Sequence, residues 1–218
     1  MPEACACPLC ASSQARYLVS DRRRDYHRCG TCDLVFVPER FFLSPADEKA
    51  LYDMHENDPG DMAYRDFLSR LFEPMLERLP EKARGLDFGS GPGPTLSLMF
   101  EERGHEMRIY DSFYAPDAAA LSGEYDFITA TEVVEHLHRP AFELERLWSL
   151  LRPGGWLGIM TSRHDSAQDF LTWHYRNDPS HVIFFSERTF GWLGDEWRTE
   201  PRFPAADVAL MQKPAVIP

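Results

Sequence analysis

The sequence predicts an α/β fold in which a doubly wound sheet holds a nucleoside ligand, preceded by a small N-terminal zinc ribbon. Three observations predict it. A glycine turn at residues 85–94 is followed by an acidic residue, Asp111, twenty positions past its middle glycine. Apolar runs of strand length alternate with segments of helical period. All five cysteines lie within the first 32 residues.

The cysteines form two Cys-x-x-Cys pairs separated by eighteen residues, a spacing found in zinc ribbons. We expect these pairs to bind one structural zinc ion, because disulfides are rare in a reducing cytosol. The expected ligands are Cys7, Cys10, Cys29 and Cys32. Residues 1–40, with short strands near 17–19 and 25–27, have too small a core to fold without the metal.

Cys5 and His27 are spare donors in the ribbon. Either could join the metal site, but four thiolates already complete a closed tetrahedral site. We therefore expect Cys5 to be a free thiol and His27 a solvated imidazole.

Arg22, Arg23 and Arg24 follow one another at the far turn of the ribbon. The first forty residues carry +1 of the net charge of −12, so the remaining residues carry −13. Such an acidic chain repels phosphate, and we expect a solvated turn rather than a nucleic-acid contact.

Residues 41–80 are expected to form a helical linker or cap. Apolar residues at i, i+3 and i+4 from Tyr64 to Leu79 predict a helix that packs on the sheet, and Pro74 should bend or split it. The polar break at 54–60 is either a plain interhelical loop or a loop at the mouth of the ligand site.

The glycines at 89, 91 and 93 suit a strand that turns abruptly into a helix at about 95–103 and whose main chain touches its ligand. Asp111 ends the next apolar run, so its two oxygens can bind ribose hydroxyls there. The turn begins with an acidic residue, Asp87, in the order Asp-x-Gly-x-Gly-x-Gly.

This order, followed by the segments 125–137 and 150–161, resembles class I S-adenosylmethionine-dependent methyltransferases over roughly residues 60–213. The resemblance implies a Rossmann-like methyltransferase domain at 81–218, with S-adenosylmethionine as cofactor. The cofactor-binding residues that it implies are Asp87, Gly89, Ser90, Gly91, Gly93, Asp111, Ser112, Phe113, Thr131 and Glu132.

The sequence departs from this family's pattern after Asp111. Only thirteen residues, 112–124, stand where the family usually has two helices and a strand. The third strand of the sheet should therefore be shortened or missing, with one short helix near 116–121. Phe113 or Tyr114, rather than an acidic residue, should then cover the adenine ring.

The segment 173–190 resembles a loop that lies over the acceptor site in bacterial small-molecule methyltransferases. The candidates for a catalytic base are His181, Tyr175, His136 and His174, each of which could instead make a structural hydrogen bond. We rank His181 first because imidazole titrates nearest neutral pH. Ser186 should cap a helix to Leu193, and 198–203 should pair with 207–212.

We therefore expect a cytoplasmic methyltransferase that acts on a small molecule. With 44% hydrophobic residues, 218 residues suffice for one core and a small appendage. No apolar run approaches the ~20 residues of a membrane span. The alternatives are an RNA or protein methyltransferase that holds its substrate with the ribbon, and a non-catalytic scaffold that binds the cofactor.

Overall fold

The computed structural model describes residues 5–54, 57–164 and 167–215, and its larger sheet has six strands. Their order is β5-β4-β6-β7-β10-β9. The first four are parallel, whereas β10 is antiparallel to both of its neighbours. The strands are β4 (Arg84–Phe88), β5 (Glu106–Tyr110), β6 (Tyr125–Thr131), β7 (Leu151–Met160), β9 (Arg202–Ala205) and β10 (Val208–Gln212).

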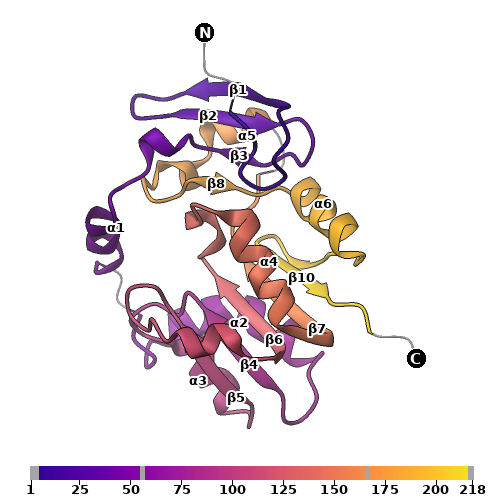
Figure 1. Ribbon diagram of the computed structural model, residues 1–218. Helices are drawn as coiled ribbons and strands as arrows, with labels where there is room; N and C mark the ends of the chain where they lie inside the picture. The colour runs from indigo at the N-terminus through magenta and orange to yellow at the C-terminus, as the bar shows by residue number, and fades with distance from the viewer. Residues whose placement is uncertain (1–4, 55–56, 165–166, 216–218) are drawn as a thin grey trace.

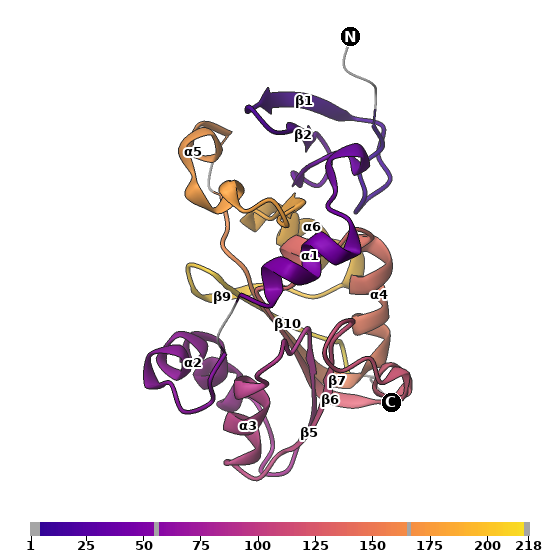
Figure 2. The same cartoon turned by 90° about the vertical axis from the view of Figure 1, so that its left-hand side faces the viewer.

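Helices cover both faces of this sheet, with α2 and α3 on one side and α4 on the other (Figure 2). Side chains alternate along a strand, so β6 supplies both cores. Phe127 packs in the cluster under α2, and Ile128 packs in the cluster with Leu144 of α4. The helices are α2 (Met62–Leu76), α3 (Thr95–Glu101), α4 (Pro140–Leu150) and α6 (Glu187–Trp197).

The predicted loss of the third strand is confirmed for the described residues. β5 is an edge strand, and only an isolated bridge between Asp111 and Ala115 and a 3-10 helix, η2 (Ala118–Ser122), precede β6. The Asp117 side chain caps η2 by accepting a hydrogen bond from the Ala119 amide at 2.9 Å.

The N-terminal strands form a second sheet that continues into the C-terminal half of the chain (Figure 1). Its order is β1-β2-β3-β8, in which Val35 and Phe36 of β3 pair with Phe184 and Ile183 of β8. The strands are β1 (Ala15–Ser20), β2 (Asp25–Cys29), β3 (Val35–Phe36) and β8 (Ile183–Phe184).

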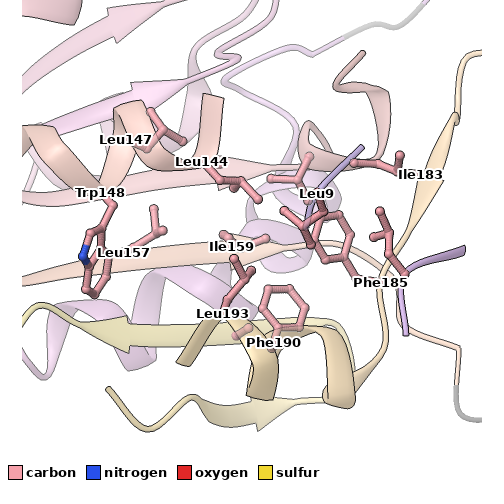
Figure 3. Close-up of a cluster of buried hydrophobic side chains, with 14 of the residues drawn as sticks. Leu9, Leu144, Leu147, Trp148, Leu157, Ile159, Ile183, Phe185, Phe190 and Leu193 are labelled. Carbon is pink, nitrogen blue, oxygen red and sulfur yellow. The ribbon is translucent and has the colours of Figure 1, made fainter. Parts of the chain in front are cut away.

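The two sheets also share one apolar core. Leu9 from the N-terminal segment lies beside Ile183 and Phe185, in the same cluster as Leu144 and Phe190 (Figure 3). The first forty residues are therefore packed into the body of the protein and not only joined to it by a linker.

Arg24 corrects the expectation of a fully solvated arginine turn. Arg22 and Arg23 are exposed, but Arg24 is only 5% exposed. Its guanidinium donates to the backbone oxygens of four residues at 2.6 to 3.0 Å, and its Nε donates to the Tyr26 hydroxyl at 3.1 Å. The four acceptors are the carbonyl oxygens of Arg176, Asp178, Pro179 and His181.

His27 is a second correction. Its ring is 2% exposed and lies between Tyr17 and Phe36, and neither ring nitrogen has a hydrogen-bond partner in the described part of the chain. Burial lowers its pKa. The imidazole is therefore a buried side chain that packs against neighbouring rings of the small sheet, and it is not solvated.

Two helix predictions are also corrected. Pro74 does not split α2, because it lies in the last turn, where only two helical residues follow it. Helix α6 extends past Leu193 to Trp197, where Arg198 ends it in a left-handed conformation (φ 55°). Ser186 caps α6 as expected, within a capping box completed by Thr189.

The remaining elements connect these layers. They are α1 (Pro45–Tyr52), α5 (Ala167–Thr172), η1 (Glu39–Phe41), η3 (Val134–His136) and η4 (His174–Asn177). Among the described residues, no helix combines the length and the apolar composition needed to cross a bilayer.

We expect Arg24→Ala to destabilise the protein by about 3 kcal/mol or more, because buried carbonyl groups lose a charged donor. Hydrogen exchange of the amides in 176–183 should also accelerate, since this loop loses its anchor. Thermal melting and exchange mass spectrometry measure the two effects. Arg23→Ala, an exposed position in the same turn, is the control and should change stability by less than about 0.5 kcal/mol. Equal effects of both variants would contradict the assignment.

Candidate functional site

A cavity of about 640 Å³ opens at the carboxyl ends of β4, β5 and β6. This is the edge of a parallel sheet at which ligands bind in open α/β folds, and the volume is within the range of small-molecule sites. The glycine turn, the segments after β5 and β6, helix α1 and the loop before β8 contribute to its wall.

The turn after β4 requires glycine at two positions on steric grounds. Gly89 has φ +76°, and a β-carbon there would lie 2.3 Å from a methyl group of Val133. A β-carbon on Gly93 would lie 1.8 Å from the carbonyl oxygen of Asn57. Glycine at these positions therefore lets Val133 and the Asn57 backbone pack directly against the turn.

Asp111 holds the neighbouring turn in place. Its Oδ2 accepts a hydrogen bond from the Gly91 amide at 3.0 Å. Its Oδ1 accepts from the amides of Phe113 and Tyr114 at 2.8 and 3.0 Å. The carboxylate thus ties the glycine turn to the segment after β5, and Oδ2 keeps one lone pair that can face the cavity.

Asp87 ends β4 below this turn and is buried. Its oxygens accept hydrogen bonds from Thr129 at 2.9 Å and from Ser97 at 3.1 Å. Burial raises its pKa from 3.8 to about 6, against the effect of these two hydrogen bonds.

Helix α1 contributes to the cavity wall, which the sequence did not predict, together with residues after it. Glu48, Tyr52 and Asn57 line the cavity. The Tyr52 ring contacts both Phe113, at a centroid distance of 5.8 Å, and His136, at 5.2 Å. The position of Asn57 agrees with a loop at the mouth of the site, although 55–56 lie outside the described residues.

His136 and His181 lie together in the cavity wall opposite the glycine turn, with ring centroids 4.7 Å apart. Burial, with a smaller contribution from the nearby His136, lowers the pKa of His181 to about 4. The reason for ranking His181 first is therefore wrong, because its ring does not titrate near neutral pH. His174 is exposed and is not among the residues that line the cavity.

Tyr175 is not part of the cavity lining in the described chain. Its hydroxyl lies between the buried carboxyl group of Glu135, which it contacts closely, and the half-buried carboxyl group of Glu132 at 3.1 Å, and it lies 3.2 Å from the Thr161 hydroxyl. Burial raises the pKa of Tyr175, which disfavours the deprotonated form that a catalytic base requires.

The carboxyl groups of Glu132 and Glu135 occupy the end of β6. Burial raises the pKa of Glu132 to about 8 and that of Glu135 to about 7, and the charge of Glu135 adds to the effect on Glu132. Glu132 also has a φ of +51°, a left-handed conformation that is uncommon outside glycine. Strain of this kind is frequent at functional sites.

All ten residues expected to bind the cofactor line this one cavity, although they come from three separate segments of the chain. Two of them carry hydroxyl oxygens, Ser90 Oγ and Thr131 Oγ1, that are buried without a hydrogen-bond partner in the described residues. A ligand in the cavity would meet both.

The four expected zinc ligands also converge. The sulfurs of Cys7, Cys10, Cys29 and Cys32 lie within 4.8 Å of one another. Cys7 and Cys32 are 3.5 Å apart, as are Cys10 and Cys29. Sulfurs bound to one zinc ion at ~2.3 Å in a tetrahedron lie about 3.8 Å apart, so the group fits a Cys₄ site.

The chain belongs to a methyltransferase family, because the family described as "Methyltransferase domain" matches residues 55–196. Solved structures share the fold. One is the 1,6-didemethyltoxoflavin-N1-methyltransferase of Burkholderia thailandensis, with 18% identity, a TM-score of 0.51 and coverage of 92% of this chain and 99% of that one. Another is an O-methyltransferase family protein of the same organism, with 15% identity, a TM-score of 0.53 and coverage of 82% and 63%.

Curated relatives match more locally. The tRNA 5-carboxymethoxyuridine methyltransferase of Escherichia coli (strain K12) is 29% identical over 139 residues, covering 52% of this chain and 53% of the relative. The ubiquinone biosynthesis O-methyltransferase of Aeromonas salmonicida is 32% identical over 77 residues, covering 35% and 32%. The chain thus spans about half the length, or less, of the curated relatives it matches.

We expect the free energy of unfolding to decrease between pH 5 and 7 because of Asp87, and Asp87→Asn to remove this decrease. Because the folded-state pKa is raised to about 6, the folded protein binds this proton more tightly than the unfolded chain. The resulting stabilisation is complete below the unfolded value of 3.8 and is lost as pH rises through about 6, which amounts to about 1 kcal/mol between pH 5 and 7. Urea unfolding of both proteins at pH 5, 6 and 7 measures the difference, and identical pH dependence would contradict it.

Proposed function

We propose that this chain is an S-adenosylmethionine-dependent methyltransferase that transfers a methyl group to a small-molecule acceptor. The observation that carries the proposal is the convergence of the glycine turn, Asp111 and the end of β6 on one cavity in a chain of the methyltransferase family. A structural neighbour with the same fold is described with S-adenosylhomocysteine bound.

The described residues fit this cofactor. The glycine turn lines the cavity with main chain, and the absence of a β-carbon at Gly93 lets the Asn57 backbone close over it. The remaining lone pair on Asp111 Oδ2 suits a ribose hydroxyl, and Phe113 and Tyr114 would border the adenine in place of a third strand. The hydroxyls of Ser90 and Thr131 would find partners in the ligand.

When bound, the cofactor supplies a methyl group on a positively charged sulfur, and the chain's contribution is to hold donor and acceptor in line. Tyr52 lines the cavity and contacts both Phe113 and His136, so its ring would lie between the adenine end and the end at His136 and His181. With a pKa of about 4, His181 is neutral at pH 7 and would orient the acceptor by a hydrogen bond.

RNA is the second candidate acceptor, because a curated relative is a tRNA methyltransferase. The charge distribution favours a small molecule instead. One of the three successive arginines is buried in the protein's interior, and residues 41–218 carry a net charge of −13. RNA binding that weakens steeply with salt would favour the second candidate.

We also propose that the four cysteines bind one structural zinc ion. Cys7, Cys29 and Cys32 are buried, and the group belongs to the same apolar core as β8 and α6. The metal would thereby fix the small sheet that holds the loop at 176–181.

We expect the chain to bind S-adenosylmethionine and Asp111→Ala to weaken binding by about 1.5 to 3 kcal/mol, because a charged hydrogen-bond acceptor is lost. Isothermal titration calorimetry measures the affinity of both proteins for S-adenosylmethionine. The control is Asp117→Ala, which removes an exposed acid six residues later that is not among the residues lining the cavity. Unchanged affinity in Asp111→Ala would show that the ribose is held elsewhere.

Elemental analysis of protein purified with zinc should find one equivalent that depends on the four cysteines. Cys29→Ser should lose most of it, since three thiolates leave the tetrahedral site incomplete. Cys5→Ser is the control, because this residue is not in the converging group of four. A zinc content far below one equivalent, or equal loss in both variants, would contradict the site.

A further inference from the structure

A second group of potential metal ligands lies at the acceptor end of the cavity. One ligand atom from each of Glu135, His136 and His181 lies within 4.8 Å of the other two. Ligands bound to one ion at ~2.1 Å are at most about 4.2 Å apart. Side-chain adjustments of less than 1 Å would therefore bring the three onto one ion.

The two imidazoles are oriented as metal ligands usually are. His136 Nδ1 lies 3.1 Å from the carbonyl oxygen of Ser180, and His181 Nδ1 lies 2.8 Å from that of Tyr175. An Nδ1–H that donates to a carbonyl fixes the tautomer in which Nε2 carries the lone pair. Both rings line the cavity.

The surroundings are negatively charged. Besides Glu135, two further acidic residues are nearby: Glu132 and Asp178 line the same cavity as the two histidines. Asp178 Oδ2 lies 3.8 Å from His181 Nε2. In the described part of the chain, the carboxyl groups of Glu132 and Glu135 accept hydrogen bonds from the uncharged hydroxyls of Tyr175 and Thr161. A divalent cation would compensate this charge.

We propose that Glu135, His136 and His181 bind a divalent transition-metal ion at the acceptor end of the cavity, with Glu132 and Asp178 as the nearest further donors. Two imidazoles with one carboxylate favour ions such as Mn²⁺, Fe²⁺, Co²⁺ or Zn²⁺ over Mg²⁺ or Ca²⁺. Three protein ligands leave positions that oxygen atoms of an acceptor can occupy. Only the binding of an acceptor to the ion rests on the proposed function. Binding of the ion itself can be tested separately.

The test is a titration of the 218-residue chain, loaded with one equivalent of zinc for the cysteine site, with MnCl₂, followed by the electron paramagnetic resonance signal of the free ion. Mn²⁺ is chosen because thiolate sites select softer ions, so the cysteine group contributes little. We expect one ion per chain, and His181→Ala and His136→Ala should weaken binding by about tenfold or more. His174→Ala removes an exposed histidine in the same loop and should bind Mn²⁺ like the unmodified chain.

Calorimetry with S-adenosylmethionine on the same samples separates the two proposals. Loss of Mn²⁺ binding with cofactor binding retained supports the metal site, whereas loss of cofactor binding in the unmodified chain would count against the proposed function alone. Where a histidine variant does not fold, anomalous diffraction from Mn²⁺-soaked crystals of the unmodified chain decides. An anomalous peak between His136 and His181 is expected. The absence of that peak, or equal affinity in His181→Ala and His174→Ala, overturns the proposal.

Discussion

The contact between the Arg24 guanidinium and four backbone carbonyls of residues 176–181 is the constraint on which the shape of the site depends. This loop has little regular structure of its own, and it carries Asp178 and His181 into the cavity wall. A planar guanidinium can donate to several carbonyls at once, whereas a lysine ammonium cannot span them. Because Arg24 lies in the turn of the small sheet, order in that sheet is transmitted directly to the part of the cavity wall formed by Asp178 and His181.

A second constraint compensates for the short connection after β5. Without a third strand, β5 is an edge, and the segment that follows has no sheet to hold it. Asp111 replaces that support with three hydrogen bonds from backbone amides on both sides of the cavity mouth. Tyr114 is held from the other side, where its hydroxyl donates to Asp53 at 2.6 Å at the end of α1. Local hydrogen bonds thus order a segment that the family usually orders by sheet pairing.

The sequence predicted those parts of the fold that are determined locally. The glycine turn, the convergence of four cysteines and the missing strand follow from spacing and chain length, which require no knowledge of packing. It could not show which of three successive arginines turns inward, because that depends on carbonyl groups about 150 residues away. The burial of His27 and the contact of Tyr52 with the cavity were missed for the same reason. Each depends on elements that meet only in the folded chain.

Three of the carboxyl groups with raised pKa values lie where the cavity opens. Asp87 lies near the end of β4, while Glu132 and Glu135 follow β6, and these two strands are adjacent in the middle of the sheet. Each buried charge disfavours the folded state near neutral pH, and Glu132 adds a strained backbone conformation. Apolar residues at these positions would stabilise the folded state, because no charge would be buried at the ends of the two strands. Costs to stability that are concentrated where a cavity opens are expected of a functional site.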